Sequence, residues 1–119
     1  MTNQTIHLAL LQRTYDAFNA RDIEAVLETM TPDVDWPNAW EGGRVSGRAA
    51  VRDYWTRQFA AIHPHVDPTD FTELEDGRIQ VSVRQKVMDL AGRLLDETTV
   101  VHIYTFRHGL IDRMDIEVY

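Results

Sequence analysis

The second half of the chain carries a hydrophobic alternation that constrains the fold more than any other feature. Across Ile79–Met88, apolar side chains occupy alternate positions, with Gln85 as a polar member of the same face. Such alternation is typical of a strand with one buried face. Asp76–Gly77 before this run predicts a tight hairpin turn, and Ala91–Arg93 after it predicts another. The pattern therefore predicts antiparallel strands that follow one another along the chain.

Three further segments extend the predicted sheet. Asp96–Arg107 has the pattern of a long strand, and a turn at His108–Gly109 leads into a last strand, Leu110–Tyr119. Val66–Leu74 is predicted as a weaker strand. Pro68 within it indicates the edge of a sheet, because proline lacks the amide hydrogen that a central strand donates.

The first half instead shows apolar residues at helical spacing. Helices are predicted over Thr5–Ala20, Ile23–Met30 and Gly47–Ile62. Asp22 and Ser46 are the expected N-caps of the second and third helices, since short oxygen-bearing side chains satisfy free amides there. A turn at Thr31–Asp33 and a short strand, Val34–Trp36, are predicted between them.

Three helices followed by hairpin-joined strands predict an α+β fold. We expect a cone-shaped, strongly curved antiparallel sheet that is closed by the three N-terminal helices, with a cavity at the open end. A chain of 119 residues is long enough for one hydrophobic core, so residues 1–119 are predicted to form a single domain.

Charge and composition exclude several classes of function. The net charge of −7 argues against binding to nucleic acid or to an anionic membrane surface, both of which require basic patches. The chain has no cysteine, so thiol nucleophiles and thiolate metal sites are excluded. No apolar run approaches the roughly 18 residues of a spanning helix. The N-terminus lacks the basic and cleavage-site features of a signal peptide, so a cytoplasmic location is expected.

His63 and His65 are the residues that could suggest a metal site. They flank a proline, and no third ligand stands at a suitable spacing. Zinc sites in proteins need three or four such ligands. We therefore expect these histidines to be loop residues, with no metal and no cofactor in the protein.

Four segments resemble a known superfamily: QRTYDAFNARDIEAVLETM, VDWP, VSGRAAVRDYW and VVHIYTFRHGLIDRM. In order and spacing they are similar to the nuclear transport factor 2-like superfamily, especially its SnoaL-like polyketide cyclases and ketosteroid isomerases. The resemblance spans nearly the whole chain and implies the cystatin-like cone. The superfamily contains isomerases, cyclases, hydrolases, dehydratases and non-catalytic binding modules, so the fold leaves the function open.

The residues of the ketosteroid isomerases do not carry over to this chain. Where those enzymes place an oxyanion-stabilising tyrosine, this chain has Thr14, with Tyr15 next to it. Trp36 stands in place of their general base, and strand alternation turns the preceding Asp35 to the opposite face. His102 stands in place of their protonated acid. Steroid isomerisation by that mechanism is therefore not expected.

His102 is the leading candidate for catalysis. It shares a strand face with Val100, Tyr104 and Phe106, so all four are expected to face the cone. Histidine titrates near neutral pH and can act as general acid or base. The alternative is a hydrogen-bonded histidine that shapes the cavity without reacting.

Tyr15 and Tyr54 are the candidates for hydrogen bonding to a developing oxyanion. Each lies on a helix face that should close the cone, so each can equally be a core residue with its hydroxyl at the rim. Tyr15 is paired with His102 as the second predicted catalytic residue. Asp35 and Asn38, in or near the loop, could substitute for the missing base, although Asp35, Asn38 and Glu41 are more simply solvated residues.

Aromatic side chains are predicted to form one wall of the cavity. All three tryptophans lie within 20 residues of one another, and with Phe59 they can grip a flat apolar ligand or fill the cavity completely. The predicted ligand contacts are Thr14, Phe18, Trp36, Asn38, Trp40, Tyr54, Trp55, Phe59, Tyr104 and Met114.

The outer face of the sheet is predicted to mix charged and apolar residues. Arg84 and Lys86 should point outward, and Met88, Val101 and Ile103 should add apolar area beside them. A half-apolar outer face favours a homodimer that buries it. An epoxide-hydrolase-like reaction needs an inward Arg-x-Asp pair, and the pair at positions 113 and 115 should face outward.

Two hypotheses follow. The first is a SnoaL-like protein that binds a small, mostly apolar ligand and catalyses cofactor-independent acid/base chemistry on a carbonyl compound, as an isomerase or cyclase. The second is a non-catalytic ligand-binding or dimeric interaction module of the same fold. An enzyme needs polar groups that converge on one spot. A His102 packed only by hydrocarbon, or bonded to a backbone carbonyl, would favour the second hypothesis.

Overall fold

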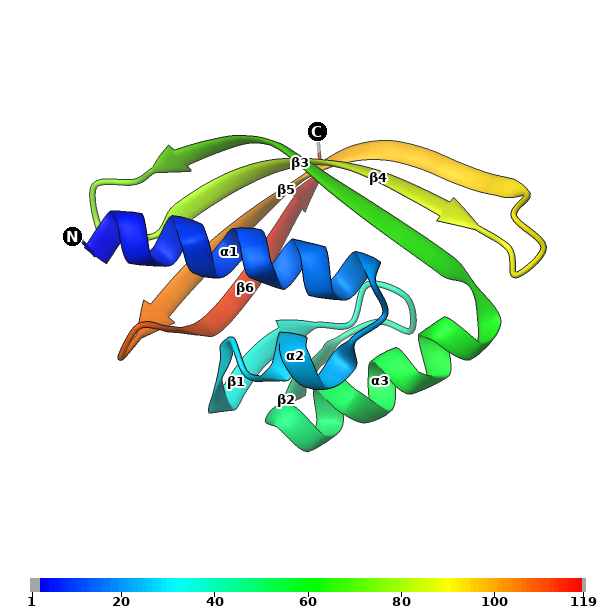
Figure 1. The fold of residues 1–119 in the computed structure, drawn as a ribbon, viewed down its shortest axis with the longest axis horizontal. Helices are drawn as coiled ribbons and strands as arrows, with labels where there is room; N and C mark the ends of the chain where they lie inside the picture. The colour runs from blue at the N-terminus through cyan, green and yellow to red at the C-terminus, as the bar shows by residue number, and fades with distance from the viewer. Residues whose placement is uncertain (1–2, 119) are drawn as a thin grey trace.

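The computed structural model describes residues 3–118 and has the predicted α+β architecture (Figure 1). The helices are α1 (Asn3–Asn19), α2 (Ile23–Leu27) and α3 (Arg48–Ala61). The strands are β1 (Met30–Pro37), β2 (Arg44–Ser46), β3 (His63–Glu73), β4 (Ile79–Met88), β5 (Leu94–Arg107) and β6 (Leu110–Val118). Tyr119, the predicted end of the last strand, lies outside the described residues. No helix in residues 3–118 is long and apolar enough to cross a membrane.

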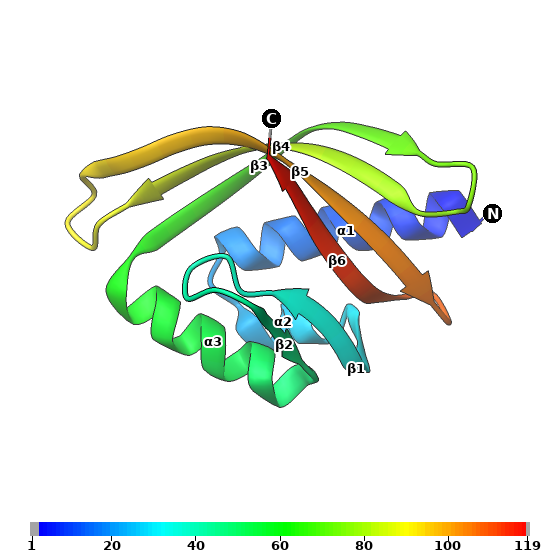
Figure 2. The ribbon, with the colours of Figure 1, turned by 180° about the vertical axis from the view of Figure 1, so that it is seen from behind.

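The six strands form one strongly curved, open sheet in the order β2-β1-β6-β5-β4-β3. The four long strands β3 to β6 are joined in sequence by antiparallel pairings, as the hairpin turns predict. The β1–β6 pairing is parallel, so the sheet is mostly rather than wholly antiparallel. In Figures 1 and 2 the long strands arch over α1, while β1 and β2 continue the sheet from β6 and lie beside α2 and α3.

The region between α2 and β1 differs from the prediction. The helix ends at Leu27 and β1 begins at Met30, so the expected helix end at Met30 and the turn at Thr31–Asp33 are wrong. Tertiary contacts override the local helical pattern there. The Thr29 carbonyl accepts a hydrogen bond from the Ile111 amide at 2.8 Å, which draws the chain onto β6. The predicted cap Asp22 does accept a hydrogen bond from the Ala25 amide at 3.1 Å.

The start of α3 also differs from the prediction. Ser46 does not cap the helix, because it belongs to β2 and pairs there with Asp35 of β1. The sequence pattern did not predict the short strand β2. Gly47 is the N-cap, with φ 89° and ψ 154°, a conformation that is almost confined to glycine. Its amide donates to the Val34 carbonyl at 2.8 Å. Gly47 therefore turns the chain from β2 into α3 while holding it against β1.

The edge strand β3 is longer than predicted. It begins at His63 rather than Val66, so His63 and His65 lie in a strand and not in a loop. The placement of Pro68 on an edge strand is confirmed, and the register of β3 against β4 shifts just after it. The chain leaves α3 at Ile62, whose extended backbone precedes a second strand proline, Pro64.

The outer face of the sheet offers less apolar surface than expected. Val101 and Ile103 are only 3% and 7% exposed in the single chain. Their strand neighbours on both sides are polar: Ser82 and Glu117 flank Val101, while Gln80 and Asp115 flank Ile103. The homodimer through this face stays a prediction.

Candidate active site

A cavity opens on the concave side of the sheet, between α1, α3 and the strands. About 90 Å³ is open to the centres of water-sized spheres. The cavity therefore has room for several water molecules or one compact organic molecule. Nine of the twelve predicted site residues line it: Thr14, Tyr15, Phe18, Trp36, Tyr54, Trp55, His102, Tyr104 and Met114.

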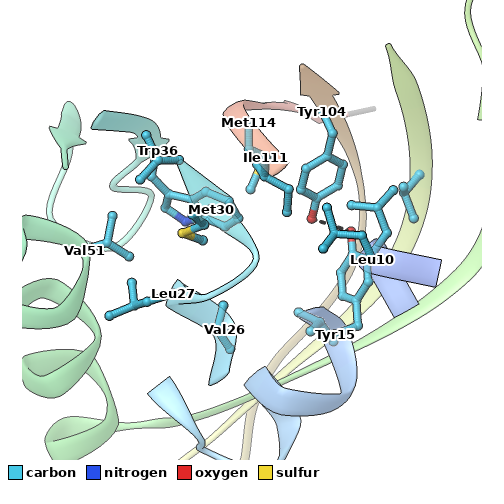
Figure 3. Close-up of a cluster of buried hydrophobic side chains, with 14 of the residues drawn as sticks. Leu10, Tyr15, Val26, Leu27, Met30, Trp36, Val51, Tyr104, Ile111 and Met114 are labelled. Atoms are coloured by element: carbon cyan, nitrogen blue, oxygen red, sulfur yellow. Dashed lines mark hydrogen bonds between the residues drawn. The ribbon is translucent and has the colours of Figure 1, made fainter. Parts of the chain in front are cut away.

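Three polar side chains meet in this cavity: Tyr15 from α1, and His102 and Tyr104 from β5. The Tyr15 hydroxyl lies 2.8 Å from Nδ1 of His102. The Tyr104 hydroxyl donates to the Tyr15 hydroxyl at 2.8 Å and lies 3.4 Å from the same Nδ1. Figure 3 shows the two tyrosines pointing toward one another, with the bond between their hydroxyls dashed. His102 is thus neither packed by hydrocarbon alone nor hydrogen-bonded to a backbone carbonyl.

The hydrogen atoms of this cluster can be placed by requiring every hydroxyl to donate once. Tyr104 donates to Tyr15, so Tyr15 is left to donate to Nδ1 of His102. An Nδ1 atom that accepts a hydrogen bond belongs to the neutral tautomer with its proton on Nε2. Without a ligand, the cluster is therefore a chain of two hydrogen bonds, from Tyr104 to Tyr15 and from Tyr15 to His102.

The second ring nitrogen of His102 faces the cavity. Nε2 has no hydrogen-bond partner among the described residues. Within residues 3–118, the only fully enclosed side-chain nitrogen or oxygen without a partner is Nη2 of Arg21. Nε2 of His102 also has no partner, so it cannot be fully enclosed. It is therefore open to the cavity that His102 lines. A ligand in the cavity can reach it.

Burial controls the protonation of all three groups. It lowers the pKa of His102 to about 4, because an imidazolium here would lose its hydration. Among the described residues, no carboxylate and no cationic side chain lines the cavity to compensate for that loss. Burial likewise raises the pKa of Tyr104, and raises that of Tyr15 well above its ordinary value. At neutral pH the cluster is uncharged, with two phenols as donors and an imidazole.

Aromatic rings enclose the rest of the site. Trp36 and Trp55 pack edge to face with ring centres 5.5 Å apart, and Phe18 packs on Trp55 at the same distance. Trp36 also lies 6.3 Å from Tyr104, which joins this wall to the polar cluster. Part of the expected aromatic wall therefore exists, formed by Trp36 and Trp55, and it leaves a cavity instead of filling it.

Three predicted ligand residues lie outside this cavity. Trp40 is 40% exposed, because it sits at the tip of a tight loop that is closed by bonds between Asn38 and the two glycines Gly42 and Gly43. The Asn38 side chain is used within that loop, bonding to Glu41. Phe59 packs instead against Phe18.

The outward placement of the acidic strand residues is confirmed. Asp35 pairs with Arg44 at 2.6 Å and with Arg113 at 2.9 Å, and Arg113 also pairs with Asp115. All four are partly solvent-exposed and none lines the cavity. These carboxylates hold β1, β2 and β6 together and are not available as a general base.

Sequence reasoning missed eight cavity residues: Val26, Pro37, Ala39, Gln58, Pro64, Val66, Gln85 and Ile116. Most are small or apolar and carry no chemical signal. Gln85 did carry one, since it interrupts an otherwise apolar strand face, and Gln58 lies on the buried side of α3. Among the described residues, no three His, Asp or Glu side chains are grouped as a metal site would require.

Known structures resemble this chain along its whole length. TerC, co-crystallised with polyporic acid, is 26% identical, with 96% of this chain and 92% of that chain covered and a TM-score of 0.82. A nuclear transport factor 2-like protein of unknown function from Burkholderia pseudomallei is 25% identical, with 100% and 92% covered and a TM-score of 0.83. A putative polyketide cyclase from Xanthomonas campestris is 23% identical, with 97% and 91% covered and a TM-score of 0.79.

These likenesses confirm the superfamily and the fold expected from the four sequence segments. No curated protein matches the chain. The family model described as the SnoaL-like domain matches residues 11–114, a span that includes the second half of α1 with Tyr15, the aromatic wall and the strand that carries His102. The chain therefore belongs to the SnoaL-like domain family.

Proposed function

We propose that this protein binds a small, mostly apolar ring ketone and catalyses a proton transfer on it without a cofactor, as an isomerase or cyclase does. The convergence of Tyr15, Tyr104 and His102 in an apolar cavity carries the proposal. A carbonyl compound needs two things for such a reaction: a base for the proton next to the carbonyl, and a donor for the oxygen that gains charge.

His102 is the base in this proposal and Tyr15 is the donor. When a carbonyl oxygen accepts the Tyr15 hydrogen, Nδ1 of His102 loses that bond. The imidazole then gives its Nε2 proton to water and takes a proton from water at Nδ1, which donates to the Tyr15 oxygen. The Nε2 lone pair is then exposed to the cavity. Tyr104 continues to donate to Tyr15 and so makes the Tyr15 hydroxyl a stronger donor.

The reaction moves one proton and one pair of electrons. Nε2 takes a proton from the carbon beside the carbonyl, and the electrons of that C–H bond pass to the carbonyl oxygen as an enolate. The resulting imidazolium returns the proton to the same or another carbon. A buried base with a pKa of about 4 returns it readily, since the charged form is poorly solvated there.

A non-catalytic ligand-binding role is the second candidate. The observation in its favour is that Tyr15, Tyr104 and His102 already satisfy one another in the free cavity. A cluster of that kind can simply shape a binding site. The two candidates differ in one outcome, which is whether a bound ketone exchanges its α-protons.

Binding of a ketone can be tested by tryptophan fluorescence with α-tetralone, a two-ring aromatic ketone. We expect saturable quenching in the wild type and in Trp40→Phe, because Trp40 lies outside the cavity while Trp36 and Trp55 line it. Trp36→Phe should lose much of the signal change. Quenching that disappears in Trp40→Phe and persists in Trp36→Phe would place the ligand elsewhere and contradict the proposal.

A further inference from the structure

The cavity has a second polar region, far along β4 from the His102 cluster. Gln85 lines the same cavity as His102. In the sheet register Val81 is the partner of His102, whereas Gln85 is the partner of Thr98. Four residues therefore separate the two levels, which is about 13 Å along the strands. Hydrogen bonds of about 2.9 Å to the protein at each end take up part of that span, so a ligand that touched both levels would carry oxygens about 7 Å apart, at opposite ends of an elongated ring system.

The Gln85 carboxamide is free. Val81 and Val83 precede it on the same strand face and are fully buried, so Gln85 is a polar residue in an apolar row. Its side chain makes no hydrogen bond to any residue in the described part of the chain. Its amide atoms are not fully enclosed either, so they are open to the cavity. An inward amide without a protein partner is available for a hydrogen bond to a ligand.

Gln58 and Tyr54 from α3 line this cavity too. Burial raises the pKa of Tyr54, and hydrogen bonds from the Trp40 backbone amide and from Gln58 oppose that rise. The phenol is therefore protonated at neutral pH, and both glutamines are uncharged. Beyond the His102 cluster the cavity thus offers neutral donors and acceptors, and none of the described residues that line it is charged.

Apolar residues make up much of the remaining lining. Phe18 and Trp55 line the cavity from the helices, and Val66 lines it as the cross-strand partner of Gln85. A ligand that fits this surface would have an apolar body and polar groups at its two ends.

We infer that Gln85 determines specificity by binding a second oxygen of the ketone substrate, at the end of the molecule away from its reacting carbonyl. The substrate class is then an elongated ring ketone with a neutral hydroxyl or carbonyl group at its far end. A carboxamide can donate to a carbonyl and accept from a hydroxyl. An ionised group finds no counter-charge in the lining and would lose its hydration on entry. This inference rests on the proposed function.

The test compares two ketones and two leucine variants. The probes are α-tetralone and the hydroxytetralone that carries a phenolic hydroxyl para to its carbonyl. Gln85→Leu removes the carboxamide from the cavity. Gln80→Leu makes the same change on the opposite face of β4 and serves as the matched control. Dissociation constants are measured by fluorescence for both ketones with each protein.

We expect the wild type and Gln80→Leu to bind the hydroxytetralone about 2- to 10-fold more tightly than α-tetralone, the range for one neutral hydrogen bond. In Gln85→Leu that preference should vanish, because the carboxamide that contacts the hydroxyl is gone. A preference that survives in Gln85→Leu, or that the wild type lacks, would overturn the inference and leave the proposed function standing. Failure of both ketones to bind the wild type would overturn the two together.

Discussion

Acidification from about pH 7 to about pH 4 should remove about 3 kcal/mol of folding stability through His102 alone. The pKa of His102 is about 4 in the folded protein and 6.5 at its ordinary value, and each unit of difference corresponds to about 1.4 kcal/mol. Between these two pKa values the unfolded chain binds a proton at this site that the folded chain does not. The contribution is therefore complete above pH 6.5 and is lost as the pH falls toward about 4.

Urea unfolding at a series of pH values measures this effect. The comparison is between the wild type and His102→Gln, which keeps a neutral hydrogen-bonding side chain at the same position. The lowered pKa values of Glu41 and Asp115, which come chiefly from their arginine partners, also make the fold sensitive to acid. Those contributions are common to both proteins and cancel in the difference. Parallel stability curves for the two proteins over this pH range would show that His102 is not buried in a neutral form.

His102→Gln should also slow proton exchange at the α-carbon of α-tetralone by about 10²- to 10⁴-fold, the usual contribution of a general base. Glutamine can hydrogen-bond to Tyr15 but cannot take a proton. Tyr15→Phe should cost about 10²- to 10³-fold, as the loss of an oxyanion donor does. The rate is measured by NMR as deuterium incorporation from heavy water.

The pH dependence of the exchange rate distinguishes a buried His102 from a solvent-exposed histidine acting as the base. The reactive form is the neutral imidazole, so the exchange rate should be level above about pH 5 and fall as the pH drops through about 4. His65→Gln is the control, because His65 is a partly exposed histidine of β3 that pairs with Asp67. Exchange that is equally fast in His102→Gln, with binding intact, would contradict catalysis and favour the non-catalytic role.

Much of the fold could be predicted because its signals are local. The alternation in β4 and β5 predicted both strands, and the same alternation placed His102 and Tyr104 on the cavity side. Helical spacing predicted the buried side of α1 and with it Tyr15. Each of these inferences depends only on how side chains alternate along one element.

The errors arose where distant contacts decide the structure. The end of α2 depends on the bond from Ile111 to Thr29, and the start of α3 depends on pairing between Ser46 and Asp35. The clustering of the three tryptophans in the sequence predicts that Trp40 belongs to the wall, but the short loop around it turns it toward solvent. The contact between Tyr15 and His102 joins residues 87 positions apart, which no local pattern reports.

The most direct test of the central claim is nitrogen NMR of the histidine side chains during titration with α-tetralone at neutral pH. The chain has five histidines, and the account predicts that His102, assigned through His102→Gln, is neutral with its proton on Nε2 in the free protein. On binding, its proton should move to Nδ1, as Tyr15 turns to the ketone oxygen and the Nε2 lone pair is exposed. A charged His102 in the free protein, or ring-nitrogen signals that do not change when the ketone binds, would contradict the account.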